Sequence, residues 1–353
     1  MTFTKPLALG GLALTTTLAL AGCAGDGGGA ATMSLTGAGA TFPNPVYQRW
    51  FDEYHRSTGV QINYQSIGSG GGIRQFSEQT VDFGATDGPM KDDAIAALDG
   101  NVLHIPTVIG AVVLTYNLPE LGETQLILDG PTTADIFLGR IAKWNDRRIA
   151  ALNPGVSLPD ADILVVHRSD GSGTTFIFSD YLSKVSTVWA EAVGADKSLQ
   201  WPVGLGAKGN EGVTQQVLQL ESTIGYVEYI YAESNGLPHA QIVNAAGKVV
   251  DPSLETASAA AAGATFSPDT DFRISITNGD GTDAYPITSF TWLLVKQHDS
   301  DTNRARTIKA FLTWMISEEA QTIAGGLKYA PLPAEVVELV RMRIDDLGAE
   351  QVE

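Results

Sequence analysis

The run RSDGSGTTF, residues 168–176, places a cation, a carboxylate, two glycines and several hydroxyl groups close together. Glycine lets the backbone approach a ligand closely, and Ser and Thr hydroxyls donate hydrogen bonds without adding charge. Arg168 can supply a full positive charge through parallel N–H donors, with Asp170 holding its guanidinium. These residue types suit an oxyanion site, although they also serve catalysis or form a plain surface ion pair worth about 0–1 kcal/mol.

Two further loops share this design. LTGAGATF ends at Thr41 and Phe42, just ahead of a predicted helix, and GSGGG begins at Gly68 and holds Ser69 at the start of another. Each loop would point unpaired backbone N–H groups and the positive end of a helix at its occupant. For one loop alone, a simple N-cap is the alternative. Three such loops in one chain favour a site for a small oxyanion.

Asp87 lies at a predicted strand-to-loop junction, after residues 81–86 and before Gly88-Pro89. One interpretation is a turn residue, because Asp is common in turns. If Asp87 instead faces an anion, it is a like charge, unless the anion still carries a proton that the carboxylate can accept. Phosphate carries such a proton near neutral pH, and sulfate does not. On this reasoning Asp87 would favour phosphate.

A secreted serine hydrolase is the rival from another class, with Ser172 or Ser69 as nucleophile. His167 is close in sequence to Ser172, but the chain has no G-x-S-x-G elbow, and neighbours at a strand end rarely form a triad. Residues 204–209 satisfy G-x-G-x-x-G, but Pro202 precedes them and no clear apolar strand leads in, so we interpret them as a structural loop. We expect no enzyme activity, no cofactor and no metal site.

Apolar periodicity predicts the elements that position these loops. Predicted strands cover 62–64, 163–166 and 287–295, and predicted helical faces cover 46–54, 73–76, 178–185 and 308–316. Strands and helices alternate, as in an α/β protein. An apolar segment at 104–110 and the stretch 284–287 predict two crossings between domains. The first domain would then use both ends of the chain, and the second its middle.

Composition limits the partners. The 353 residues are 44% hydrophobic, enough for one large core or two ordinary ones, and the length favours two. The formal net charge of −18 argues against nucleic acid and anionic membrane surfaces as partners. Any anion site must therefore rely on nearby donors and positive charges, because the negative potential of the whole molecule opposes anion binding.

The N-terminus is typical of an export signal. Lys5 precedes an uncharged stretch, 6–21, that is too short to span a bilayer. The sequence LAGC ending at Cys23 resembles a lipoprotein signal, so this single cysteine is predicted to be acylated after cleavage. Residues 24–32 have nothing to pack and are predicted to be a flexible tether. We expect a body outside the cytoplasm, periplasmic or at the cell surface, held to a membrane by lipid.

Eight motifs in fixed order resemble the phosphate-binding proteins of phosphate-specific ABC importers. They are LTGAGATFPNPVYQRW, YQSIGSGGGIRQF, VDFGATDGPM, FLGRIAKWND, LNPGVSLP, HRSDGSGTTFIFSDYL, WPVGLGAKGNEG and IGYVEYIYA. The match runs from about Ser34 to the C-terminus. It implies a type II periplasmic-binding-protein fold, in which two α/β domains are joined by two crossover strands and hold the ligand in the cleft between them. It also implies delivery of inorganic phosphate to a permease and ATPase complex, with a phosphate sensor or scavenger as the alternative.

The resemblance implies a phosphate site, position by position. Its residues are Thr41, Phe42, Ser69, Asp87, Arg168, Asp170, Ser172, Gly173 and Thr174. In the family, the residue matching Phe42 gives its backbone N–H, and the Ser and Thr residues give backbone or hydroxyl donors. By the same resemblance, Asp87 accepts the phosphate proton and Asp170 braces Arg168.

The resemblance also sets the expected domain bounds. Residues 1–22 are the signal and 23–33 the tether, 34–110 with 287–353 form domain I, and 111–286 form domain II. Two positions depart from the family pattern: Gly70 stands where a second Ser is common, and Thr86 where a Ser is common. The first departure would alter one hydrogen bond or the stiffness of the loop. We expect a monomer.

Overall fold

The computed structural model describes residues 33–98, 101–264, 266 and 270–348. The predicted signal, its tether and Cys23 lie outside these residues. The chain from Met33 onward clusters into one unit by its contacts. In the part described, no helix combines the length and apolar character needed to cross a membrane.

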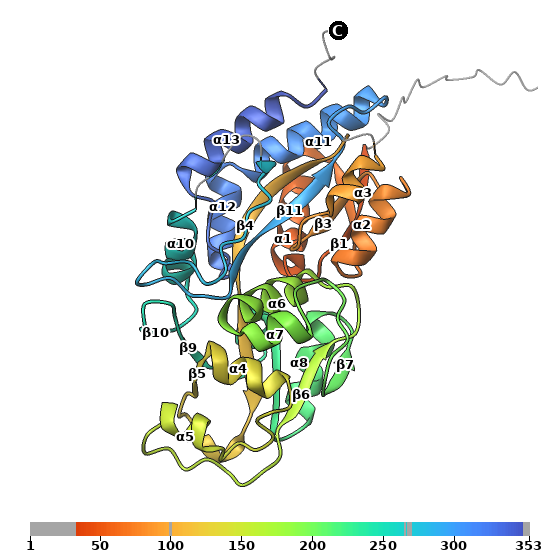
Figure 1. The fold of residues 1–353 in the computed structure, drawn as a ribbon. Coiled ribbons are helices and arrows are strands. Elements are labelled where there is room, and N and C mark those ends of the chain that lie inside the picture. The colour runs from red at the N-terminus through yellow and green to blue at the C-terminus, as the bar shows by residue number, and fades with distance from the viewer. Residues whose placement is uncertain (1–32, 99–100, 265, 267–269, 349–353) are drawn as a thin grey trace, which may run out of the picture. The chain divides into compact units, whose positions relative to one another are not determined.

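Eight strands form the main sheet, in the order β2-β1-β3-β11-β4-β8-β6-β7 (Figure 1). They are β1 Ser34–Gly39, β2 Gln61–Ser66, β3 Phe83–Thr86, β4 Leu103–Asn117, β6 Leu164–Arg168, β7 Leu205–Ala207, β8 Thr223–Glu228 and β11 Thr288–Val295. β1 is parallel to β2 and β3, and β6 is parallel to β7 and β8. β11 runs antiparallel to both of its neighbours. A smaller sheet joins β5 Ile127–Asp129, β9 Gln241–Val243 and β10 Val249–Val250.

β4 is one long strand shared by two parts of the sheet. From Leu103 to Ala111 it pairs with β11, and from Val112 to Asn117 it pairs with β8. Its residues are buried up to the last one, which explains the near-continuous apolar run expected of a strand covered on both faces. The crossing predicted at 104–110 falls within this strand. The division into domains I and II stays a prediction.

Helices flank both parts of the sheet (Figure 1). They are α1 Asn44–Thr58, α2 Ser69–Ser77, α3 Asp92–Ala96, α4 Gly130–Phe137, α5 Arg147–Leu152, α6 Gly173–Val185, α7 Thr187–Ala192, α8 Gly209–Gln219, α9 Tyr229–Ser234, α10 Leu254–Ala262, α11 Thr302–Met315, α12 Glu318–Gly326 and α13 Ala334–Asp345. A 3-10 turn, η1, covers Pro119–Leu121. α1 and α2 pack on β1–β3, whereas α6 and α8 pack on β6 and β8.

The predicted elements occur close to their expected places. The strands expected at 62–64, 163–166 and 287–295 are β2, β6 and β11. The first predicted helical face is the buried side of α1, which ends where Gly59 adopts a left-handed φ of 77°. On that face Trp50 is fully buried and its indole N–H donates to the carbonyl of Ala320, 2.7 Å away. α1 is thereby fixed to α12.

Our interpretation of residues 204–209 as a structural loop is wrong. Leu205–Ala207 form the edge strand β7, parallel to β6, and α8 begins at Gly209. The strand is short, and Leu205 and Gly206 are exposed. No apolar run therefore marks it in the sequence.

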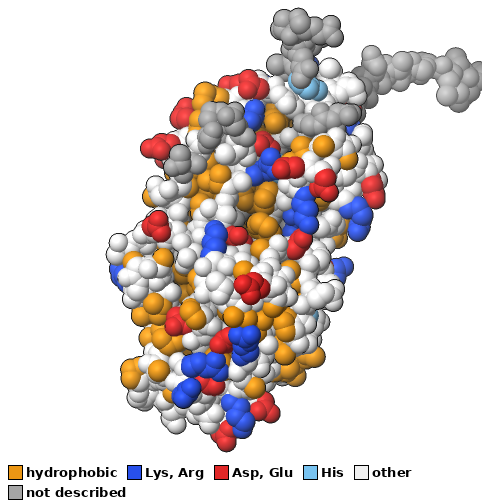
Figure 2. All heavy atoms as spheres, viewed as in Figure 1, with side chains coloured by type: hydrophobic (Ala, Val, Ile, Leu, Met, Phe, Trp, Pro, Cys, Tyr) orange, Lys and Arg blue, Asp and Glu red, His pale blue; other side chains and the backbone are white. Residues whose placement is uncertain are grey.

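The surface mixes charges of both signs. Figure 2 shows acidic and basic side chains interspersed on the face in view. Arg148, for example, contacts Asp135 at 2.8 Å and Asp146 at 3.0 Å. Such exposed pairs each contribute about 0–1 kcal/mol to stability.

Candidate anion-binding site

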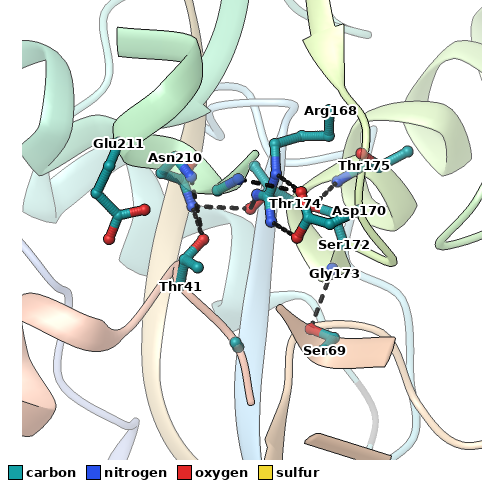
Figure 3. A network of polar contacts seen from close by, with 12 residues as sticks. Thr41, Ser69, Arg168, Asp170, Ser172, Gly173, Thr174, Thr175, Asn210 and Glu211 are labelled. Atoms are coloured by element: carbon teal, nitrogen blue, oxygen red, sulfur yellow. Dashed lines mark hydrogen bonds and ion pairs between the residues drawn. The ribbon is translucent and has the colours of Figure 1, made fainter. Parts of the chain in front are cut away.

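Three loops meet where β1, β2 and β6 end. They lead into α1, α2 and α6, so the N-termini of these helices approach one region (Figure 3). The side chains drawn from the β1 and β2 loops, Thr41 and Ser69, face those of the β6 loop. Eight of the nine predicted site residues are buried: Thr41, Phe42, Ser69, Asp87, Arg168, Ser172, Gly173 and Thr174. The structure thus gathers residues that are far apart in the sequence.

Arg168 and Asp170 form a buried ion pair, not a surface one. The guanidinium donates from Nε to Oδ1 at 2.8 Å and from Nη2 to Oδ2 at 2.6 Å, and the arginine side chain is 1% exposed. A third donor, Nη1, reaches the hydroxyl of Thr174 at 3.2 Å. Burial opposes ionisation of Asp170, but the hydrogen bonds and charge of Arg168 bring its pKa below the ordinary value. The carboxylate therefore braces the arginine.

Ser69 joins three loops through one hydroxyl. Its Oγ accepts from the backbone N–H of Gly173 at 3.0 Å and of Asp87 at 3.2 Å. The N-cap of α2 is Gly68, without a side-chain hydrogen bond, so Ser69 does not act as a helix cap. A Cβ on Gly173 would lie 2.5 Å from the Cβ of Asp87. Glycine is thus required for this approach.

Asp87 follows β3 and is 1% exposed, unlike an ordinary turn residue. Its Oδ1 accepts from the hydroxyl of Thr291 at 2.7 Å, and Ser69 donates to Oδ2 at 3.4 Å. Burial raises the pKa of Asp87 to about 7, although these hydrogen bonds and the charge of Arg168 act in the opposite direction. Asp87 is therefore an acceptor among donors. Its carboxylate is costly to ionise unless a neighbouring group or ligand donates a proton to it.

The first loop is held by three side chains that the sequence did not indicate. The hydroxyl of Thr41 accepts from Asn210, at 2.8 Å from Nδ2 and 3.2 Å from the backbone N–H. Tyr231 donates to the carbonyl of Thr41 and Tyr329 to that of Phe42, both at 2.6 Å. Asn210 and Tyr231 lie within motifs quoted above, but no local pattern shows that they face this loop.

The capping alternative holds for the third loop only. Ser172 is the N-cap of α6, and its Oγ accepts from the backbone N–H of Thr175 at 3.0 Å. The N-cap of α1 is Pro43, so Thr41 does not cap that helix. Of the three loop hydroxyls considered as caps, only that of Ser172 is used in this way. Gly173 and Thr174 form the first turn of α6.

Lys197 is a second cation near the site that the sequence did not indicate. Its ammonium donates to the carbonyl of Pro89 at 2.7 Å and of Gly88 at 3.3 Å, and lies 5.4 Å from the centre of the Phe176 ring. Burial lowers the pKa of Lys197 to about 8, although the charge of Asp196 and, more weakly, that of Asp87 raise it. The residues just after Asp87 are thereby tied to the loop after α7.

The pair considered for hydrolysis is engaged elsewhere. The ring of His167 stacks on Trp201 at 4.8 Å, and its Nδ1 lies 3.0 Å from the carbonyl oxygen of Arg168. Burial lowers the pKa of His167. Ser172 meanwhile caps α6. This arrangement gives no support to a serine nucleophile activated by His167.

The two departures from the family pattern lie at the site. The backbone N–H of Gly70 donates to the carbonyl of Gly171 at 2.8 Å, and a Cβ on Gly70 would lie 3.1 Å from the Cα of Gly171. The two loops therefore approach closely because a glycine stands here. Thr86 donates from its hydroxyl to the carbonyl of Gly88 and keeps the bend after β3.

Comparisons with known proteins place the chain among binding proteins. The family model of the PBP superfamily domain matches residues 24–319. The chain is 46% identical over 309 residues to the phosphate-binding protein PstS of Pasteurella multocida, which covers 88% of this chain and 89% of the relative. It is 38% identical to the phosphate-binding protein PstS of Methanocaldococcus jannaschii, over 94% and 93% of the two chains. A periplasmic phosphate-binding protein solved with phosphate, PfluDING, superposes with a TM-score of 0.71 at 21% identity, over 88% and 93% of the chains.

Proposed function

Because this chain belongs to the PBP superfamily and, within it, to the PstS phosphate-binding proteins, we propose that it binds inorganic phosphate for an ABC-type importer. The predicted type II periplasmic-binding-protein fold is confirmed by the mixed α/β sheet and by the likeness to solved phosphate-binding proteins. The family consists of binding proteins, so we expect phosphate to leave the site chemically unchanged.

One observation carries the proposal: a buried group of donors surrounds a single acceptor. Arg168 supplies the positive charge, and helix N-termini with the hydroxyls near them supply neutral donors. Asp87 is the acceptor, and its raised pKa means that it favours an arrangement with a proton close to its oxygens. A phosphate that still carries one proton satisfies both requirements. These contacts support the nine site residues proposed above.

We propose that the ligand is enclosed by closure of domain I, 34–110 with 287–353, on domain II, 111–286. β4 and the stretch 284–287 that leads into β11 would carry the connection between them, and the hinge would lie where β4 changes partner, from Ala111 to Val112. Closure excludes water and strengthens each hydrogen bond to the ligand, because the local dielectric constant falls. An acidic protein could thus hold an anion through local contacts, although its formal net charge is −18.

Discrimination against sulfate follows from Asp87. A sulfate oxygen has no proton to donate, so it would face a buried carboxylate that is left unpaired. A buried polar group left without its partner can reject an analogue by roughly 10⁴ to 10⁵. Arsenate carries the same proton as phosphate, so we expect it to compete with phosphate far better than sulfate does.

Titration calorimetry with phosphate, sulfate and arsenate tests the function directly. We expect tight, stoichiometric binding of phosphate, measurable binding of arsenate and no detectable binding of sulfate at millimolar concentration. Phosphate binding as weak as that of sulfate would contradict the proposed function. Tight binding of sulfate would leave an anion-binding function intact but remove the role of Asp87.

We further propose that the protein works outside the cytoplasmic membrane, anchored by lipid on Cys23 and docking as a monomer on a permease and ATPase complex. The predicted lipoprotein signal and the family's role support this. Cys23→Ser should release the protein from the membrane fraction without changing its affinity for phosphate. Retention of that variant in membranes would contradict the lipid anchor.

A further inference from the structure

Asn210 stands in the first turn of α8, fully buried, with every donor and acceptor of its side chain engaged. Its Oδ1 accepts from the backbone N–H of Glu228 at 2.9 Å. This bond fixes the orientation of the amide, because the oxygen must face that N–H and the nitrogen must face the other way. Nδ2 donates to the hydroxyls of Thr41, at 2.8 Å, and Thr174, at 3.2 Å. Figure 3 shows the dashed lines that run from this amide to the two threonines.

A hydroxyl oxygen has two lone pairs and one proton. Thr41 Oγ1 accepts two hydrogen bonds, from Nδ2 and from the backbone N–H of Asn210. Thr174 Oγ1 also accepts two, from Nδ2 of Asn210 and from Nη1 of Arg168. Both oxygens therefore have their accepting capacity filled by protein N–H groups. Each hydroxyl can only donate its proton to a further partner.

Ser69 follows the same scheme without Asn210. Its Oγ accepts from the backbone N–H groups of Gly173 and Asp87, so it too can only donate its proton, which in this structure goes to Oδ2 of Asp87 at 3.4 Å. The Asp87 carboxylate, whose oxygens can accept further hydrogen bonds, is then the acceptor that remains for a proton of the ligand. The hydroxyls cannot accept a hydrogen bond from a second proton on the ligand. Specificity therefore depends on how many protons the ligand carries.

We propose that Asn210 is a positioning residue that fixes Thr41 and Thr174 as hydrogen-bond donors toward the bound anion, so that the site takes the form of phosphate with one proton. The inference rests on the proposed phosphate function and adds a residue to it. Asn210 acts through the two hydroxyls. Its effect is on how affinity depends on the protonation of the ligand.

The consequence is a difference in pH profile. Where phosphate carries two protons, the wild-type protein must release one for each ligand bound, so affinity falls as pH falls. The slope of log Kd against pH counts the protons released, at about tenfold per pH unit for each proton. In Asn210→Ala the two hydroxyls regain free lone pairs and can hold a second proton. The slope between pH 5.5 and 7.5 should then be lower by up to one proton.

Phosphate titrations of the wild type and Asn210→Ala over this pH range test the inference. At pH 7.5 we expect the variant to bind about 5- to 100-fold more weakly, because the hydroxyls lose their fixed orientation. A purely structural role would weaken binding by the same factor at every pH. Equal slopes in the two proteins would therefore overturn the inference. If the wild type itself fails to bind phosphate, the proposed function is what fails.

A second variant at Asn210 and a control variant at another buried asparagine complete the test. Asn210→Asp is nearly the same size but replaces the donating amide with an acceptor, so the threonine hydroxyls would donate to it instead of to phosphate. We expect it to bind more weakly at pH 7.5 than Asn210→Ala, and wild-type affinity would overturn the inference. Asn153→Ala is the control, because Asn153 is equally buried and bonds the backbone of Ile127 and Ile149. It should leave the slope unchanged.

The comparison also allows for other titrating groups. Those around the two hydroxyls are Asp87, Arg168, Asp170, Glu211, Glu228 and Tyr231. All six are present in every protein compared, so their titration contributes equally to each profile. The slopes are therefore compared between the wild type, Asn210→Ala and Asn153→Ala, which carry the same titrating groups, and Asn210→Asp is compared by its affinity at pH 7.5 alone.

Discussion

At the scale of single residues, Asp87 costs the ligand-free protein stability at neutral pH. Its pKa rises from 3.8 in the unfolded chain to about 7 in the fold. Between these values the folded state holds a proton that the unfolded state releases, so the free energy of unfolding falls as pH rises from about 4 to 7. The same burial that underlies the proposed selectivity of Asp87 thus weakens the unoccupied fold.

Asp87→Asn should reverse this cost. We expect the free energy of unfolding of the ligand-free protein at pH 8 to rise by roughly 1–4 kcal/mol, because a neutral amide has no charge to desolvate. Discrimination between phosphate and sulfate should fall, because an amide can also donate. Urea denaturation at pH 5 and pH 8, with sulfate titrations, measures both effects. An unchanged stability at pH 8 would show that Asp87 is not desolvated as proposed.

Asp170→Asn is the matched control, with the opposite sign. Here the folded pKa is below the ordinary value, so ionised Asp170 stabilises the fold above the unfolded pKa. Removing its charge leaves Arg168 buried without a counter-charge. We expect a loss of about 3–5 kcal/mol in the free energy of unfolding.

Much of the site was predictable residue by residue, but its supports were not. Thr41, Ser69 and Arg168 stand out because glycines and a helix start lie beside them in the sequence. Asn210 and Tyr329 contact the first loop across 169 and 287 residues of sequence. No local pattern records contacts of that range. The sequence indicates which loops are candidates for binding, and the fold determines which side chains hold them in place.

At the scale of elements, the packing of α2 on the sheet depends on Gly72, the third glycine from the N-terminus of this helix. A Cβ on Gly72 would lie 2.5 Å from the carbonyl oxygen of Ala38 and 2.9 Å from that of Ala85. Both are backbone atoms, in β1 and in β3, and they cannot move aside as a side chain can. The absence of a side chain at Gly72 therefore sets how closely the helix that carries Ser69 packs on the sheet.

Gly72→Ala should push α2 away from the sheet. We expect a loss of about 1–3 kcal/mol in the free energy of unfolding, with weaker phosphate binding because Ser69 moves with the helix. Gly71→Ala is the control in the same helix, since its Cβ would meet only the side chain of Ile67. Thermal unfolding and calorimetry should separate the two variants. Equal behaviour of both would contradict the packing argument.

Element prediction succeeded where periodicity is long and failed where it is short. α1 and β11 carry buried faces long enough to set a period, and both were predicted. β7 has three residues at the edge of the sheet, two of them exposed, so it shows neither alternation nor an apolar run. Its place is set by pairing with β6 instead.

At the scale of the whole molecule, Lys197 ties proposed domain II to the Gly88-Pro89 turn of proposed domain I. Its pKa of about 8, below the usual 10.5, means that the ammonium is fully charged only below pH 8. The folded state loses this proton before the unfolded state does, so the free energy of unfolding rises between about pH 8 and 10.5. The charge that would favour both the proposed closure and the bound anion is lost over the same range.

Phosphate affinity should therefore fall as pH rises through about 8. Lys197→Met should bind phosphate about 10- to 100-fold more weakly at pH 7 and lose this fall, because hydrogen bonds from a charged donor are removed. Lys91→Met is the control: its exposed pair with Asp196 joins the same two loops, so we expect at most about fivefold. A fall through pH 8 that persists in Lys197→Met would assign the titration to another group.

The position of β11 in the sheet fixes when the molecule can form. Thr288–Val295 lies between β3 and β4 and pairs with both. Until a ribosome has made this segment, the facing edges of β3 and β4 have no partner, and the sheet cannot be completed. Pairings across such distances form slowly. The complete sheet can therefore form only after most of the chain has left the ribosome, which lengthens the time during which a secretion machinery that threads unfolded polypeptides could engage it.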